Sequence, residues 1–116
     1  MSLERMLDTL VSLGLTRTEA QAYIFLAKMG PHRGKELANA LKLTEQQLHS
    51  SLKSLQAKGI VNAILERPAR FSAVSLERVL DQFMKTKKEQ AKALQASREE
   101  LLSKWRSMLE KDSSNE

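Results

Sequence analysis

A run of hydrogen-bonding side chains stands at residues 44–54, where the sequence reads TEQQLHSSLKS. Gln, His and Ser side chains can pair with flat polar ligands such as the edges of nucleic-acid bases, and a Gln amide can bind adenine through two hydrogen bonds. Leu48, Leu52 and Leu55 recur here at helical spacing, so the polar residues fall on the opposite side of one helix. We therefore expect a helix at residues 44–58 with one apolar face and one polar, ligand-binding face.

Residues in the first turns of such a helix lie nearest to the bases when the helix enters a DNA groove. The candidates for base contact are Thr44, Gln46, Gln47, His49 and Ser50. The alternative is a polar face that only keeps the helix soluble, but such a face usually carries more Glu and Lys pairs. Glu45 also lies in the first turn of this helix. We expect its negative charge to interact favourably with the helix dipole, rather than its carboxylate to accept a hydrogen bond from cytosine N4.

The basic charge of the chain is concentrated in its first part. The net charge is +5 and the sequence pI is about 9.7. Residues 1–75 hold ten Lys or Arg and six Asp or Glu, whereas residues 76–116 hold nine and eight. Such an excess is typical of proteins that neutralise nucleic-acid phosphates. The candidates for phosphate contact are Arg33, Lys35, Lys42, Lys53, Arg67 and Arg70.

Other kinds of chemistry have little support in the sequence. The chain of 116 residues has no cysteine, which excludes disulfides, thiolate catalysis and cysteine-bound zinc. His32 and His49 are the only histidines and have no paired acids nearby, so neither a metal nor a cofactor is expected. No catalytic Ser/His/Asp arrangement or phosphate-binding glycine loop is present. The sequence also lacks a signal peptide and a membrane span, and we expect a cytoplasmic protein that is not an enzyme.

Glycines and prolines divide the chain into short elements that end by residue 68. Ser2 and Gly14 bound a first predicted helix, and a second begins at Thr16, where Glu19 can complete a capping box, and ends at Gly30. Its predicted inward face is Ala20, Tyr23, Ile24 and Ala27. A third helix of GKELANAL, with Leu37, Ala38 and Leu41 facing inward, precedes the helix at 44–58. Two short helices joined by a tight turn form a helix-turn-helix pattern.

The next segment changes to strand-like composition. IVNAIL is rich in β-branched residues, and RFSAV partly alternates between apolar and polar residues. ERPA between them supplies a turn. We expect a β-hairpin at residues 60–74 with Arg67 and Arg70 at its tip. A hairpin directly after a helix-turn-helix is the wing of a winged-helix domain. The predicted fold class is therefore mainly α with a small β part, a winged helix-turn-helix domain at residues 1–75.

A long helix is predicted from Ser75 through residues 76–112, followed by a disordered tail at 113–116. About 36 residues without a breaker would span roughly 50 Å. An apolar seam at 3,4 spacing, interrupted by Lys87 and Arg98, predicts a dimer interface. Its predicted contacts are Met84, Ala91, Leu94, Leu101, Trp105 and Met108. The alternative is a helix that folds back on its own domain.

Several of these segments together resemble a known family. The distinctive parts are Leu13-Gly14-Leu15-Thr16 with Glu19-Ala20 and Tyr23, then Leu55 with Lys58-Gly59, and Arg67-Pro68. The combination resembles the winged-helix domain of the TrmB family of transcriptional regulators, which are mostly archaeal, over roughly residues 7–85. The resemblance implies a dimeric, cytoplasmic regulator that inserts its fourth helix into the major groove of double-stranded DNA.

The sequence also departs from that family. Glu66 stands where glycine is often found in the wing, which places an acid near the phosphates. Arg33 replaces a Thr or Ser that often caps the third helix, so the cap is left to Gly34 or to backbone, and Glu45 replaces a frequent basic residue. The chain ends after its long helix, so we do not expect the sugar-responsive mechanism of longer members.

The function that we predict from the sequence is sequence-specific regulation of transcription by a homodimer. Its helix at 44–58 would occupy the major groove and its wing at 60–74 the flanking minor groove or backbone. The alternatives are a winged-helix adaptor that binds other proteins in a transcription or other assembly, and an RNA-binding winged domain. The sequence identifies no small-molecule effector.

Overall fold

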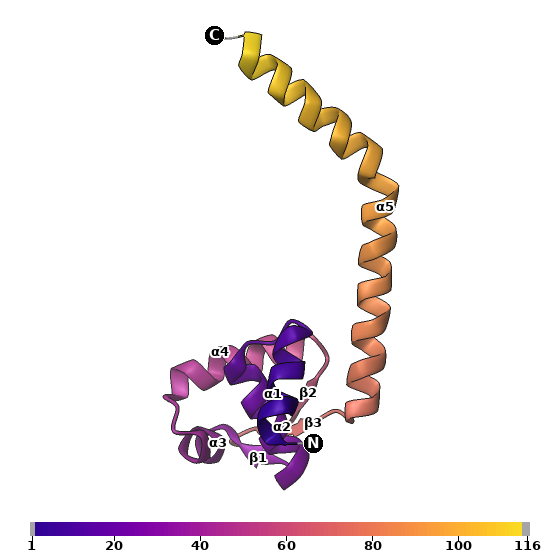
Figure 1. Cartoon of the computed structure of the whole chain (residues 1–116). Coiled ribbons are helices and arrows are strands. Elements are labelled where there is room, and N and C mark those ends of the chain that lie inside the picture. The colour runs from indigo at the N-terminus through magenta and orange to yellow at the C-terminus, as the bar shows by residue number, and fades with distance from the viewer. Residues whose placement is uncertain (1, 115–116) are drawn as a thin grey trace. The chain divides into compact units, whose positions relative to one another are not determined.

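The structure of the protein is a computed structural model that describes the backbone of residues 2–114 and the side chains of residues 2–111. The chain forms two compact units, residues 1–80 and residues 81–116 (Figure 1). The first unit contains four helices and a small sheet, and the second is the greater part of one long helix.

Local hydrogen bonds begin the first two helices where the sequence predicts them. Helix α1, Leu3–Ser12, starts after Ser2, whose side chain accepts from a backbone N–H of the first turn. Helix α2, Arg17–Met29, begins with a complete capping box between Thr16 and Glu19. Each cap satisfies backbone donors that have no partner inside the helix.

The next two helices form the helix-turn-helix. Helix α3, Gly34–Leu41, has Arg33 in its N-cap position, and the Arg33 backbone N–H donates to Glu36 Oε1 at 2.9 Å. The cap position is therefore Arg33 itself and not Gly34. Lys42 adopts a left-handed conformation with φ of 58°, which reverses the chain toward helix α4, Glu45–Ala57.

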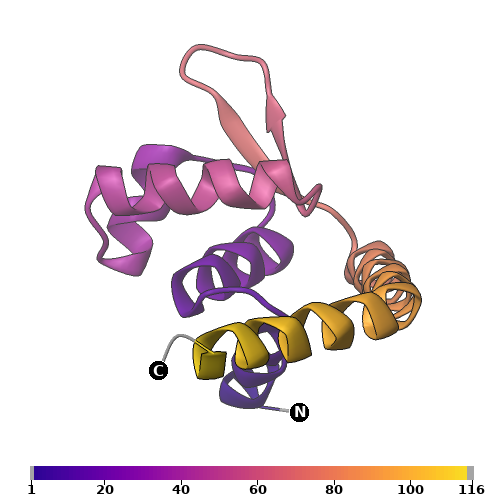
Figure 2. The same cartoon turned by 90° about the horizontal axis from the view of Figure 1, so that it is seen from above.

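The first unit also contains a sheet of three strands, one of which lies between α2 and α3 in the chain. Its strands are β1, His32–Arg33, β2, Val61–Ile64, and β3, Arg70–Ala73, in the spatial order β1-β3-β2 with antiparallel pairing throughout. Strands β2 and β3 are the predicted hairpin, and they extend away from the helices beside the C-terminal end of α4 (Figure 2). The two-residue strand β1 was not expected from the sequence.

Strand β1 changes the interpretation of two arginines. Arg33 lies directly opposite Arg70 in the β1-β3 pair. Arg70 does not lie in the turn itself but next to it, because it begins β3 and pairs with Ile64, the last residue of β2. Arg67 does lie in the turn between the two strands.

The core of the first unit gathers apolar residues from all of its helices and from the sheet. Helix α2 is central, because it packs against α1, α3, α4 and β3. The buried apolar residues are Leu7, Leu10, Leu15, Ala20, Ala22, Tyr23, Ile24, Leu26, Leu37, Ala38, Leu48, Leu52, Leu55, Ile60, Val61 and Val79. Two predicted core positions differ, since Ala27 is exposed and Leu41 is only half-buried.

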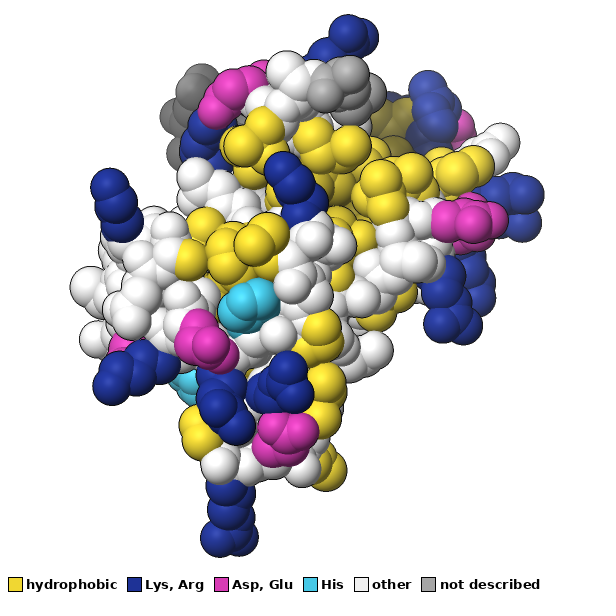
Figure 3. Space-filling model, turned by 90° about the horizontal axis from the view of Figure 1, so that it is seen from below, with side chains coloured by type: hydrophobic (Ala, Val, Ile, Leu, Met, Phe, Trp, Pro, Cys, Tyr) yellow, Lys and Arg dark blue, Asp and Glu magenta, His cyan; other side chains and the backbone are white. Residues whose placement is uncertain are grey.

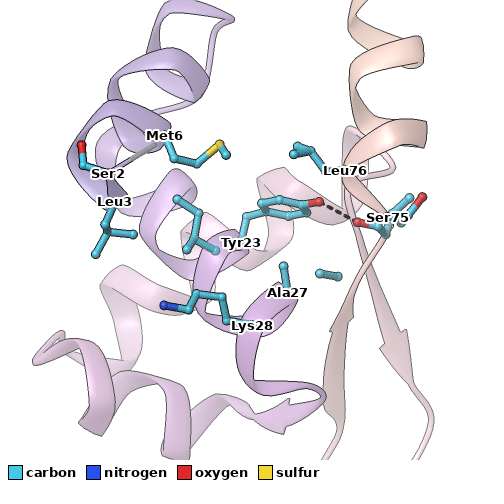
Figure 4. A pocket seen from close by; sticks show the side chains of 11 residues that line it. Ser2, Leu3, Met6, Tyr23, Ala27, Lys28, Ser75 and Leu76 are labelled. Carbon is cyan, nitrogen blue, oxygen red and sulfur yellow. Dashed lines mark hydrogen bonds between the residues drawn. The ribbon is translucent and has the colours of Figure 1, made fainter.

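Tyr23 ties α2 to the end of the sheet. Its hydroxyl donates to the backbone oxygen of Val74 at 2.7 Å (Figure 4). Burial raises the pKa of the Tyr23 hydroxyl, so it stays protonated and remains a donor. A hollow of about 510 Å³ lies beside it, with apolar walls that include Leu3, Met6 and Leu76.

Helix α5, Leu76–Ser114, begins in the first unit and makes up the described part of the second. The Ser75 side chain accepts weakly from the Arg78 backbone N–H at 3.4 Å, and Val79 is buried in the core of the first unit. Residues 115 and 116 of the predicted tail lie outside the described residues, whereas the helix continues through Ser114. At 1.5 Å per residue its 39 residues extend roughly 58 Å.

Candidate nucleic-acid interface

Helix α4 is held by its leucines and presents its other side to solvent. Leu48, Leu52 and Leu55 are buried against α2 and α3, which pack on this helix. Among the polar residues, Gln46, Gln47, His49, Ser50 and Lys53 are exposed. The leucine spacing thus orients the whole polar face, and that face is free for a ligand.

The N-terminus of α4 is fixed by a capping box. The Gln47 backbone N–H donates to Thr44 Oγ1, and the Thr44 backbone N–H donates to Gln47 Oε1, both at 3.1 Å. These two candidate residues therefore use an acceptor oxygen each inside the protein. The Gln47 amide nitrogen and the Thr44 hydroxyl proton are left for an outside partner.

A groove separates the start of α4 from the wing. Gln46, His49 and Glu45 of α4 line it together with Lys35 of α3, and its volume is about 630 Å³. Its opposite wall consists of residues of the hairpin, Pro68, Ala69 and Phe71. Two predicted base contacts, Gln46 and His49, and one predicted phosphate contact, Lys35, therefore lie in one groove with an apolar wall that was not predicted from the sequence.

A second, more open hollow of about 560 Å³ lies on the other side of the polar face. Gln46, Gln47, Ser50 and Thr44 line it. The remaining lining residues are Thr16 and Thr18 at the start of α2 and Ser51 of α4. The α2 threonines lie about thirty residues from α4 in sequence, and only the packing of α2 against α4 brings them to this surface.

The six predicted phosphate contacts do not have equal charge environments. Arg33 Nη2 lies 3.9 Å from Glu66 Oε2, and Arg70 Nη1 lies 3.8 Å from Glu66 Oε1. The other four form no ion pair within residues 2–111; these are Lys35, Lys42, Lys53 and Arg67. On the face shown in Figure 3, acidic side chains lie among the basic ones and interrupt the positive surface.

Glu19 is a buried acid of α2 that helps to position α4 through its C-terminal end. It is 2% exposed, accepts from the Thr16 backbone N–H at 2.9 Å and forms a 3.0 Å ion pair with Lys58 at the C-terminal end of α4. Burial alone would raise the pKa of the Glu19 carboxyl, but hydrogen bonds from Thr16, Ser54 and Lys58 and the Lys58 charge together lower it. The carboxylate stays ionised and links the start of α2 to the end of α4.

The tip of the wing carries an exposed leucine that was not predicted from the sequence to be part of the site. Leu65 is 96% exposed, more than any other large hydrophobic residue in the described part of the chain. It lies beside Glu66 and Arg67 in the turn. Its position in the sequence could have indicated this exposure, because an apolar residue between a strand and a Pro-containing turn lies too far from the core to be buried there.

Two further observations limit the kinds of site. No group of three or more metal-binding side chains occurs among the residues that the structure describes. His32 instead lies 2.8 Å from the Gly30 backbone oxygen through Nδ1 and makes an edge contact with Phe25. Within the described residues no helix is both long and apolar enough to cross a membrane.

Comparison with known proteins decides the family. The model of the family described as the sugar-specific transcriptional regulator TrmB matches residues 10–77, which include all of α2, the helix-turn-helix and the wing. The chain belongs to the TrmB family. It is therefore a winged-helix protein of a family of DNA-binding transcriptional regulators, not of enzymes, and the predicted family and fold class are confirmed.

Individual relatives agree with this assignment. The HTH-type sugar sensing transcriptional regulator TrmBL1 of Pyrococcus furiosus is 31% identical over 78 residues, which are 67% of this chain and 23% of that protein. TrmBL2, described as an archaeal chromatin protein with a novel mode of DNA binding, has a TM-score of 0.76 and 27% identity, covering 95% of this chain and 46% of its own.

A shorter structure matches over nearly its whole length. The ST1889 protein of the thermoacidophilic archaeon Sulfolobus tokodaii has a TM-score of 0.65 and 25% identity, covering 80% of this chain and 98% of that chain. By contrast, this chain spans about a quarter of TrmBL1 and under half of TrmBL2.

Proposed function

We propose that this TrmB-family protein binds double-stranded DNA sequence-specifically as a homodimer and regulates transcription in the cytoplasm. Helix α4 would enter the major groove, and the wing would contact the flanking minor groove or backbone. The observation that carries this proposal is the exposed, mostly uncharged polar face of α4 beside the wing. Such a face supplies hydrogen bonds for bases, whereas surrounding Lys and Arg residues supply phosphate contacts.

The residues of α4 divide into two proposed roles. Gln46, His49 and Ser50 have no hydrogen bond to another described residue that would hold their side chains, and we assign base contact mainly to them. Thr44 and Gln47 would fix the end of the helix and contact bases only through their remaining donors. The proposed phosphate contacts are Arg67, Lys42, Lys53 and Lys35, together with Arg33 and Arg70, which both face Glu66.

Dimerisation through α5 would set the spacing of the DNA site. The predicted interface residues Met84, Leu94, Leu101, Trp105 and Met108 are 52% to 70% exposed, and Ala91 is also exposed. An apolar seam of this size in water favours a partner surface. A two-fold dimer presents two α4 helices, so we expect a palindromic site with half-sites about 34 Å apart.

Selection from random duplexes followed by sequencing tests this proposal. We expect an enriched palindromic sequence and binding that weakens steeply as salt rises. TrmBL2 is described as a chromatin protein, so recovery of bound duplexes without any enriched sequence would favour binding without sequence preference. No binding to any duplex near 50 mM salt would contradict the proposal and favour the adaptor function, and stronger binding to RNA would favour the RNA-binding alternative.

Two substitutions separate the base contact from the phosphate contact. Gln46→Ala should lose discrimination at one position of the selected site, by about 1–3 kcal/mol, while binding to unrelated duplexes changes little. Arg67→Ala should weaken all duplexes about equally and reduce the salt dependence by about one phosphate contact. Fluorescence anisotropy on the selected site and on a scrambled duplex measures both. Equal loss on both duplexes from both variants would contradict this division of roles.

A further inference from the structure

Three charged side chains meet at the outer end of the hairpin, where the strands enter the wing turn. Arg33 on β1 and Arg70 on β3 lie directly opposite each other in the antiparallel pair, and Glu66 of the wing turn lies within 4 Å of both. Like charges at opposed positions of a strand pair repel each other. An anion between them relieves this repulsion, and in the free protein the Glu66 carboxylate is that anion.

The arrangement of Arg33 and Arg70 resembles a phosphate-binding site in which the Glu66 carboxylate takes the place of the phosphate. Each Glu66 oxygen faces one arginine, at 3.9 Å and 3.8 Å, which is within ion-pair distance but too long for a hydrogen bond. The three side chains are 40% to 47% exposed, so water and an external anion can reach them. Guanidinium groups bind phosphate oxygens by shorter, charge-assisted hydrogen bonds. A phosphodiester can therefore replace the carboxylate at small cost.

We infer that Arg33 and Arg70 form one phosphate-binding site and that Glu66 occupies this site until DNA displaces it. The inference rests on the proposed DNA binding and adds a competing internal ligand to it. Lys35, Lys42, Lys53 and Arg67 have no such competitor among the described residues. Glu66 thus lowers the affinity for every duplex. Base contacts then supply a larger fraction of the total binding free energy.

Glu66→Gln is the direct test, because it removes the charge and nearly preserves the shape. At about 150 mM salt we expect its affinity for both specific and scrambled duplexes to rise about threefold to tenfold. The salt dependence should steepen by about one phosphate contact, because DNA then displaces solution anions rather than Glu66 from the arginines. An unchanged thermal unfolding midpoint would show that the variant folds normally.

A double-mutant comparison separates this mechanism from a simple change of net charge. In a background with Arg33→Gln and Arg70→Gln, Glu66→Gln should raise affinity no more than the control substitution Glu45→Gln does. Glu45→Gln is the matched control, since Glu45 is an exposed acid near the groove without an ion pair to either arginine. It should change affinity equally in both backgrounds. An equal gain from Glu66→Gln in both backgrounds, or a loss of affinity in the wild-type background, would overturn the inference.

A titration with inorganic phosphate tests the site without DNA. The NMR signals of the Arg33 and Arg70 Nε–H groups should shift at lower phosphate concentration in Glu66→Gln than in the wild type. If neither signal moves, the inference is overturned even where DNA binding holds. If the phosphate site responds but the wild type binds no duplex, the proposed function fails and the anion site stands.

Discussion

At the residue scale, Glu19 shows how one buried carboxylate serves two elements. It completes the capping box of α2 and pairs with Lys58, which is 39 positions away at the end of α4. A buried carboxylate is unfavourable unless hydrogen bonds and an opposite charge compensate its lost hydration. Here both are present, so the residue stabilises the arrangement of α2 and α4.

Replacement of this acid should destabilise the protein in a pH-dependent way. We expect Glu19→Gln to lower the free energy of unfolding at pH 7 by about 1–3 kcal/mol. The pKa of Glu19 is lower in the folded state than its ordinary value of 4.5, so its contribution is present above that value and is lost as the pH falls through the folded pKa. The stability difference between wild type and variant should therefore shrink as the pH falls below 4.5.

Thermal unfolding at several pH values measures this difference. Glu36→Gln is a suitable control, because Glu36 is an exposed carboxylate that also accepts from an N-cap backbone N–H. The control should lose much less stability than Glu19→Gln. If the difference in unfolding free energy between the wild type and Glu19→Gln does not change with pH, Glu19 is not an ionised, stabilising residue.

At the element scale, α4 needs both its cap and its leucines to present a defined surface. The leucines fix the rotation of the helix about its axis, whereas the capping box of Thr44 and Gln47 fixes where its first turn begins. Base contacts are proposed in this first part of the helix. Fraying there would move the proposed base contacts Gln46 and His49 out of their positions.

Loss of the cap should therefore weaken both stability and DNA recognition. Thr44→Ala should cost about 1 kcal/mol in unfolding free energy, because the Gln47 backbone N–H loses its acceptor. Thr44→Ser keeps the hydroxyl and should stay within about 0.5 kcal/mol of the wild type. Denaturant unfolding measures both variants, and equal stability of the two would argue against a role for the cap.

At the scale of the whole molecule, the apolar seam of α5 consists of side chains that are exposed in the described structure. An isolated helix gains little stability in water without packing of its apolar face. A second copy of the chain would cover the seam, and Trp105 is the kind of large side chain that often dominates such contacts. Lys87 and Arg98 within the seam could keep their charges in water by extending past it.

A charge placed in the seam should therefore separate the dimer. We expect light scattering to give the wild type twice its chain mass of 13.1 kDa, and Leu101→Glu the mass of one chain, because a buried carboxylate without a partner is strongly unfavourable. Ser103→Glu adds the same charge elsewhere on α5 and should leave the dimer intact. A wild type that is already monomeric would favour the helix that folds back on its own domain.

Features with local causes could be predicted from the sequence. Caps at Ser2, Thr16 and Thr44 and the leucine spacing of α4 involve residues within a few positions of each other, so pattern reasoning located the helices and the polar face. The hairpin was predictable for the same reason, since a short turn joins strands that are adjacent in the chain. The family resemblance rested on these local patterns and was confirmed by the match over residues 10–77.

Contacts between residues far apart in sequence could not be predicted in this way, because they depend on how the elements pack in three dimensions. Strand β1 exists because His32 and Arg33 pair with Phe71 and Arg70, which no local pattern of two residues could indicate. The Glu19–Lys58 pair and the Arg33–Glu66–Arg70 cluster likewise join distant elements. Which charges are free to meet a phosphate and which already face an acid depends on these pairings, because Coulomb interactions follow distance in space and not along the chain.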